Sequence, residues 1–228
     1  MSASDYSSYF HDLADYYNNS RIPSSVMTGA VEIRAEFDQS GSWVRQCAEN
    51  LQLTLAKRRV LEIGCGAGRW TQFIAEVANQ VVATDPCARL LECARLLNLP
   101  NTEFVERDFL SLEKVEGAFT GACHVNIINH IPLELLPTFL DKIHQKLEPG
   151  SPVFCASQRF RGNPEEPWYE KRETGDMVSL RHHDDGRPIE VVDTLFTEDL
   201  LKGLFIGRAQ RLEISLKHWW WWASYKVP

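Results

Sequence analysis

Three glycines at alternate positions, Gly64, Gly66 and Gly68, follow a short run of β-forming residues at 60–63. The β-forming run before them and the helical apolar spacing at 70–78 after them predict a strand, a tight turn and a helix. In a parallel α/β sheet this order presents a nucleotide site, because glycine lets the backbone approach a ligand closely. The start of the helix also offers free N–H groups to a negative group.

A second strand is predicted over Gln80–Asp85, and it ends in a carboxylate about 20 residues after the glycine turn. An acid at this spacing can accept hydrogen bonds from ribose hydroxyls. The two features together predict a ligand that contains adenosine. The dinucleotide pattern G-x-G-x-x-G would place its third glycine at position 69, where this chain has Arg69. This departure disfavours a nicotinamide cofactor.

The segment 60–68 and the acid Asp85 resemble the first motif and the second-strand acid of the class I S-adenosylmethionine-dependent methyltransferases. The resemblance implies S-adenosylmethionine as cofactor and S-adenosylhomocysteine as product. It also implies that the glycine turn faces the methionine end and that Asp85 holds the ribose. The cofactor-binding residues predicted for this chain are Glu62, Gly64, Cys65, Gly66, Gly68, Asp85, Pro86, Asp108, Phe109, Asn126, Tyr16 and Arg34.

Asp108 and Phe109 stand at the end of a predicted third strand, Glu103–Asp108, where the ligand face of a parallel sheet lies. In the resembled family an acid here bonds the adenine amino group, and its apolar neighbour packs on the ring. The resemblance therefore implies these roles for Asp108 and Phe109. Asp108 has an alternative interpretation as a helix cap or a turn residue.

The fourth strand and its exit, predicted over 121–132, supply the candidate catalytic residues. The resembled family commonly has an acid after the aromatic that opens this segment, but here Thr120 follows Phe119, so the family's base cannot be carried over. We instead predict His130 as general base, because histidine titrates near working pH and this one lies at the ligand face. Asn126, His124 and Tyr17 are weaker candidates.

Two alternatives to this catalytic role stay open. A histidine after a strand can be a purely structural hydrogen-bonding residue, and an acceptor with a free lone pair needs no base. The exit sequence His130-Ile131-Pro132 resembles a subset of small-molecule methyltransferases, which implies a small acceptor. We therefore predict in-line methyl transfer to such an acceptor, with oxygen or nitrogen as the methylated atom.

The remaining patterns predict an α/β fold: a doubly wound, seven-stranded, mostly parallel sheet with a C-terminal antiparallel hairpin. The fifth strand is predicted at 152–157 and the last two at 209–217 and 219–227. The resemblance implies that the seventh strand lies beside the fifth. One methyltransferase domain is expected, divided into a helical lid at 1–57, a cofactor-binding core at 58–157, an acceptor-side insert at 158–192, and a C-terminal helix and strand pair at 193–228.

Two segments flank the predicted acceptor side. The first predicted helix presents an aromatic face, which either packs on the sheet edge or forms a lid in which Tyr16, Tyr17 and Arg34 contact the site. In the insert, Asp185-Gly186 predicts a hairpin turn. The adjacent His182 and His183 could indicate a metal, a solvated hairpin end or a contact with the acceptor. Because neighbouring strand residues point to opposite faces, we predict no metal site.

Composition limits the classes of protein that remain. The chain has 228 residues, 44% hydrophobic residues and a net charge of −7, which suits one domain and argues against nucleic acid as a partner. Six cysteines without a C-x-x-C pair predict free thiols and a cytoplasmic location. No run of 18 apolar residues predicts a membrane span, and the first residues do not resemble a signal peptide. A monomer or a homodimer is expected, since a tryptophan of the run 219–222 could form a dimer contact.

Three functions therefore compete. The leading one is a small-molecule methyltransferase, supported by the resemblance, the insert and the acidic surface. A non-catalytic S-adenosylmethionine-binding protein stays open because the family's usual acid is missing after Phe119. A nicotinamide-dependent oxidoreductase is disfavoured by Arg69 and by the final antiparallel strands.

Overall fold

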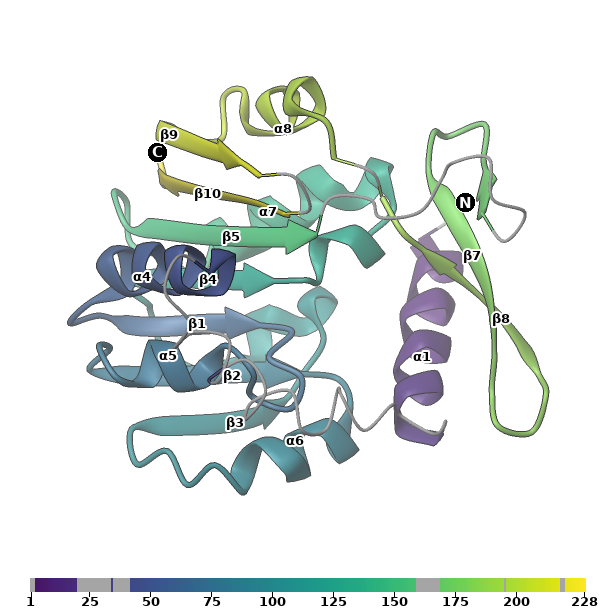
Figure 1. The fold of residues 1–228 in the computed structure, drawn as a ribbon, viewed down its shortest axis with the longest axis horizontal. Coiled ribbons are helices and arrows are strands. Elements are labelled where there is room, and N and C mark those ends of the chain that lie inside the picture. The colour runs from purple at the N-terminus through teal and green to yellow at the C-terminus, as the bar shows by residue number, and fades with distance from the viewer. Residues whose placement is uncertain (1–2, 20–33, 35–41, 159–168, 195, 218–219) are drawn as a thin grey trace.

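A computed structural model describes residues 3–19, 34, 42–158, 169–194, 196–217 and 220–228. Its main sheet has seven strands in the order β3-β2-β1-β4-β5-β10-β9 (Figure 1). The first five strands are parallel, and β10 runs antiparallel between β5 and β9. The strands are β1 (Arg59–Ile63), β2 (Gln80–Asp85), β3 (Thr102–Glu106), β4 (Gly121–Val125), β5 (Pro152–Gln158), β9 (Gln210–Leu216) and β10 (Trp220–Lys226). The predicted fold class is confirmed.

Helices cover both faces of this sheet, because alternate strand residues send apolar side chains into two separate layers. In β10, Trp221 enters one layer, and Trp220 and Trp222 enter the other. Trp219 and His218 lie outside the described residues. One face carries α4 (Trp43–Leu55), α5 (Thr71–Ala75) and α6 (Ala88–Arg95), and the other carries η1 (Phe109–Lys114), α7 (Leu136–His144) and α8 (Glu198–Phe205).

Several elements are shorter than predicted. The helix after the glycine turn spans only Thr71–Ala75. The strand predicted to reach Asp108 ends at Glu106, because Asp108 caps η1. Helix α7 begins at Leu136, with a proline in its first turn, where the missing N–H removes no helical bond. The short 3₁₀ turns η2 (Ile128–His130) and η3 (Leu133–Leu135) precede it.

The N-terminal helix and the insert lie together at the carboxyl edge of the sheet. Figure 1 shows α1 (Ala3–Asn19) beside the ends of the parallel strands, with the insert next to it. The insert forms a separate antiparallel sheet of β6 (Tyr169–Lys171), β7 (Met177–His182) and β8 (Pro188–Val192). The hairpin predicted at Asp185-Gly186 is confirmed, whereas β6 was not predicted.

Parts of both flanking segments fall outside the described residues, namely 20–33, 35–41 and 159–168. The rest of the N-terminal segment is described from Ser42, whose Oγ caps α4 by accepting from the Arg45 N–H at 3.1 Å. All six cysteines are described and free, as predicted. No helix in the described ranges is both long and apolar enough to span a membrane.

Candidate functional site

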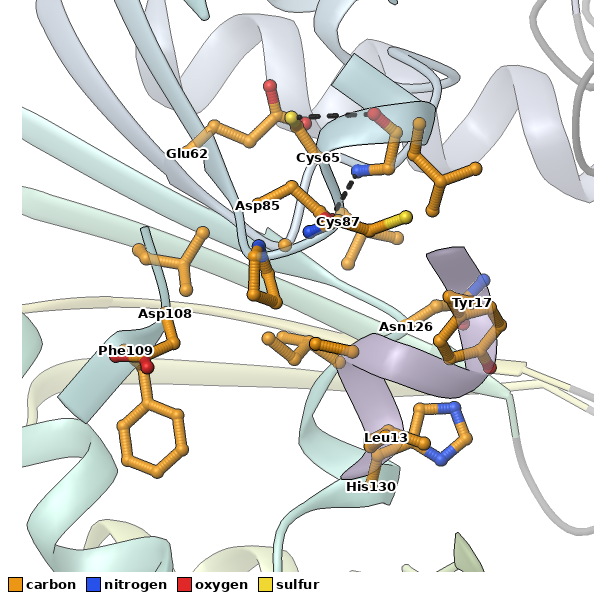
Figure 2. A pocket seen from close by; sticks show the side chains of 18 of the residues that line it. Leu13, Tyr17, Glu62, Cys65, Asp85, Cys87, Asp108, Phe109, Asn126 and His130 are labelled. Carbon is orange, nitrogen blue, oxygen red and sulfur yellow. Dashed lines mark hydrogen bonds between the residues drawn. The ribbon is translucent and has the colours of Figure 1, made fainter. Parts of the chain in front are cut away.

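A cavity of about 390 Å³ lies at the carboxyl ends of β1, β2 and β4, with α1 along one side. This volume is typical of small-molecule sites. Its lining includes most of the residues predicted from the sequence, as Figure 2 shows in part. These are Tyr17, Glu62, Gly64, Cys65, Gly66, Asp85, Pro86, Asp108, Phe109, Asn126 and His130. Helix α1 thus borders the cavity, and its role as a lid stays a prediction.

Asp85 joins the glycine turn to the start of α6. One carboxylate oxygen accepts from the Gly66 N–H at 2.8 Å, and the other accepts from the Cys87 N–H at 2.9 Å. Burial raises the pKa of Asp85 to about 6, against the opposing effect of these two N–H donors. A Cβ built at Gly66 would meet only Leu90, at 4.0 Å. The turn thus leaves open space beside a buried carboxyl group.

Glu62 contributes a second buried carboxyl group to the wall of the cavity. Its side chain is 2% exposed, and Oε2 has no hydrogen-bond partner among the described residues. Burial, with Asp85 nearby, raises the pKa of Glu62 to about 8. A buried oxygen without a partner is costly unless a ligand satisfies it. The wall is therefore suited to a ligand that donates hydrogen bonds or carries positive charge.

Asp108 and Phe109 lie together at another part of the wall. Asp108 Oδ1 accepts from the Ser111 N–H at 2.9 Å and from its hydroxyl at 2.8 Å, so the helix-cap interpretation is confirmed. The Phe109 ring stands edge-on to Phe10 and Phe139, with centroids 4.9 and 5.2 Å apart. Since Asp108 also lines the cavity, its capping role leaves the predicted cofactor role open.

Three predicted cofactor residues do not line the cavity. Gly68, at φ +80°, packs against Ala94 of α6 and against Leu97 just after this helix, and a Cβ at Gly68 would come within 2.6 Å of Leu97 Cδ1. Tyr16 packs on His183, with centroids 5.4 Å apart. Consecutive helical residues point about 100° apart, so Tyr17 faces the cavity and Tyr16 does not. Arg34 pairs with Glu76 of α5's end and lies over the Phe73 ring. The cofactor roles of these three residues stay predictions, although the cavity wall does not include them.

Sequence reasoning missed several lining residues. Arg69 and Arg107 place cationic side chains in the lining, and Phe10 and Leu13 bring apolar groups from α1. The position of Arg69 was interpreted only as evidence against a dinucleotide site. Its cationic side chain next to the glycine turn was not considered as a binding group. The aromatic face of α1 was recognised, but helical periodicity alone could not tell which of its members reach the cavity.

His130 has a defined proton arrangement. Its Nδ1 lies 2.9 Å from the Val192 carbonyl oxygen and 3.5 Å from Asp193 Oδ1. A carbonyl oxygen only accepts, so Nδ1 carries the proton of the neutral ring and Nε2 carries the lone pair. Burial lowers the pKa of His130, and Asp193 opposes this effect. The ring is therefore neutral near pH 7 and able to accept a proton.

The backbone around His130 is fixed by residues distant in the sequence. The Tyr9 hydroxyl donates to the His130 carbonyl and accepts from the Val192 N–H, both at 3.1 Å. The Thr194 N–H donates to the Asn129 carbonyl at 2.7 Å. Helix α1, the turn η2 and the end of β8 thus converge on His130. Tyr9 and Asp193 were missed, because only tertiary contacts reveal them.

The other polar residues in and just after β4, and the two histidines of the insert, lie in different environments. His124 is fully buried against Phe139, and burial lowers its pKa to about 3, so it lies in the core. Asn126 lines the cavity with a left-handed backbone, at φ +62°. His182 is exposed and His183 is buried. Within the described residues, no three His, Cys, Asp or Glu side chains form a group that could hold a metal ion.

Comparison with known proteins identifies the core of the chain. Residues 60–150 match the family model described as Methyltransferase domain. A ubiquinone biosynthesis O-methyltransferase of Xanthomonas oryzae pv. oryzae is 30% identical over 111 residues, which are 46% of this chain and 45% of that protein. The enzyme of the same name from Xanthomonas campestris pv. campestris is 27% identical over 110 residues. The chain thus matches less than half the length of these relatives.

Solved structures share most of the fold of this chain at low sequence identity. The DhpI structure in complex with SAH has a TM-score of 0.68 at 18% identity and covers 90% of this chain and 96% of its own. The N-methyltransferase NodS of Bradyrhizobium japonicum WM9 has a TM-score of 0.58 at 16% identity, covering 83% and 98%. At these identities the likeness establishes the fold.

Proposed function

We propose that the chain methylates a small molecule at oxygen or nitrogen, with S-adenosylmethionine as the methyl donor. Residues 60–150 match the methyltransferase domain, and the fold is that of the class I methyltransferases. The observation that carries this proposal is the single cavity that joins the glycine turn to His130. One end offers buried carboxyl groups to a polar cofactor, and the other offers a neutral base to an acceptor. The curated relatives act, by their names, on oxygen, which favours a hydroxyl acceptor.

The residues around the glycine turn suit S-adenosylmethionine. The unpartnered Oε2 of Glu62 would accept from the methionyl ammonium, and Arg69 would pair with the carboxylate. Asp85 keeps lone pairs beyond its two backbone bonds, and these would accept from ribose hydroxyls. Asp108 and Phe109 would hold the adenine by a hydrogen bond and by packing.

At the acceptor end, the residues of the chain orient the acceptor and take its proton. When bound, S-adenosylmethionine supplies an electrophilic methyl group and departs as S-adenosylhomocysteine. His130 Nε2 accepts the proton that the hydroxyl or amine loses as the new bond to carbon forms. Tyr17 and Leu13 of α1 close the site from solvent, which favours alignment of the reacting atoms and excludes water.

The test is methyl transfer from isotopically labelled S-adenosylmethionine to a panel of phenols, alcohols and amines, followed by mass spectrometry of the products. We expect the wild-type chain to label members of one class and His130→Gln to label them far more slowly. Labelling by neither protein, with S-adenosylmethionine bound, would favour the non-catalytic alternative. Binding of NAD in place of S-adenosylmethionine would overturn the methyltransferase assignment.

A further inference from the structure

A carboxylate that directly follows the insert lies beside the His130 ring. Asp193, just after β8, places Oδ1 3.5 Å from His130 Nδ1. Its Oδ2 accepts from the Ser179 hydroxyl at 3.0 Å and from Arg181 Nη2 at 3.2 Å. The side chains of Asp193 and His130 are 19% and 22% exposed, so water screens their interaction only in part. The carboxylate is therefore held with one oxygen toward the imidazole.

The same group reaches the helix that covers the cavity. Arg181 Nη1 donates to the Tyr17 hydroxyl at 3.4 Å, and Tyr17 lines the cavity. Tyr9, which lies in the same helix α1, bridges the His130 carbonyl and the Val192 N–H. A chain of contacts thus runs from α1 through Arg181 and Asp193 to the imidazole. Tyr17 also packs on Ala67, Cys87 and Leu90, so this chain of contacts borders the glycine turn.

We propose that Asp193 is a positioning residue for His130, that Arg181 moderates its charge, and that the insert is thereby part of the active site. This inference rests on the proposed function of His130 as the base. Asp193 holds the Nδ1 proton together with the Val192 carbonyl, which keeps the Nε2 lone pair available. When Nε2 takes the acceptor proton, the ring becomes an imidazolium, and the adjacent carboxylate stabilises that positive charge.

The two charged residues near His130 have opposite effects on its pKa. Asp193 favours the protonated ring, whereas Arg181 disfavours it. The ionisable groups that face the ring from α1 are Tyr9 and Tyr17, and burial raises the pKa of both phenols, so they are neutral. The strand β5, which also packs on η2, presents the uncharged Ser157. Removing Asp193 and removing Arg181 should therefore move the His130 pKa in opposite directions.

The experiment is an NMR titration of ring-¹⁵N-labelled histidines in the full chain, saturated with S-adenosylhomocysteine. His130 is assigned from the spectrum of His130→Gln. We expect Asp193→Asn to lower the pKa of His130, and Arg181→Gln to raise it, each by roughly one unit. Asp184→Asn and Arg187→Gln make the same charge changes at exposed positions of the same hairpin, and they should leave the His130 pKa in place. Shifts of the same sign in the first two variants, or none, would overturn the proposal.

Kinetics give a second readout. In the wild type the rate should rise with pH as His130 loses its proton, and Asp193→Asn should move this acid limb to lower pH while lowering kcat. Loss of rate without movement of the limb would indicate a merely structural role and overturn the proposal. The NMR titration needs no methyl transfer, so the coupling of Asp193 to His130 is decided even where no acceptor reacts. Failure of the proposed function is thus seen separately from failure of this inference.

Discussion

The two ends of the cavity are built in different ways. The cofactor end comes from three short segments, 62–70, 85–90 and 107–109, each at the end of a parallel strand. The acceptor end joins α1, the turn η2 and the insert, and the bond between the Tyr9 hydroxyl and the Val192 N–H spans 183 positions. Local sequence therefore specifies the first end, whereas tertiary packing specifies the second.

The ends also differ in their electrostatics. Burial raises the pKa of both Glu62 and Asp85 at the cofactor end, so these acids are held in an environment that disfavours their charge. Burial lowers the pKa of His130 at the acceptor end, so this base stays neutral. The cofactor end therefore suits a ligand that carries positive charge, and the acceptor end holds a base that can accept a proton. Substitutions at one end should therefore leave the other end unaffected.

The largest effect is expected from His130→Gln. Glutamine can still donate to the Val192 carbonyl but cannot take a proton, so kcat should fall by roughly 10²–10⁴-fold. The affinity for S-adenosylhomocysteine should stay within about twofold, because His130 belongs to the acceptor end; this separates loss of a base from loss of a fold. Steady-state kinetics and calorimetry on one preparation measure both quantities. An unchanged kcat would remove His130 from the mechanism.

Glu62 should make the ligand-free chain less stable as the pH rises. Its pKa is raised from 4.5 to about 8 in the folded state, so its stabilising effect is complete below about pH 4.5 and is lost as the pH rises toward 8. In that window, the free energy of unfolding of the wild type should fall relative to Glu62→Gln by up to about 1.4 kcal/mol per pH unit.

Urea denaturation at about pH 5 and at about pH 8.5 measures this difference. Glu92→Gln, at an exposed position of α6, is the matched control and should show no such trend. A wild-type-to-Glu62→Gln difference that stays constant with pH would show that the carboxyl group of Glu62 is solvated.

The smallest effect is expected from Tyr9→Phe, which removes a hydroxyl that joins α1 to η2 and β8. Loss of the hydroxyl leaves the Val192 N–H and the His130 carbonyl without this partner and should lower stability by about 1–2 kcal/mol. Hydrogen exchange should become faster in α1 and in η2. Tyr16→Phe, one residue from Tyr17 and outside the cavity, is the control. Equal exchange rates in the two variants would show that Tyr9 does not hold the helix.

The contrast between the ends also explains what the sequence could predict. The strands of the main sheet, the glycine turn and Asp85 are encoded within a few residues by apolar runs and glycine spacing, and all were located, whereas β6 of the insert was not. The ends of elements were less predictable. Asp108, for example, was predicted as the last residue of a strand, whereas it caps η1. The three glycines of the turn also have different roles. Gly68 lets the turn pack closely on neighbouring residues, whereas Gly66 borders the cavity.

At the acceptor end, the pattern located His130 but not its partners. Asp193 and Arg181 have no mutual spacing that a single sequence reveals, because the hairpin brings them to η2 only in the folded chain. Likewise, α1 was recognised as amphipathic, but choosing Tyr17 over Tyr16 required knowing how the helix is rotated against the cavity. Such residues are specified by packing between distant segments.

The most direct test of this two-ended site is calorimetric titration of S-adenosylhomocysteine into the wild type, Asp85→Asn and His130→Gln. A charge-assisted hydrogen bond contributes about 1.5–3 kcal/mol, so Asp85→Asn should weaken binding by roughly tenfold or more. Binding to His130→Gln should match the wild type. Equal weakening in both variants, or none in Asp85→Asn, would contradict the division of the cavity into a cofactor end and an acceptor end.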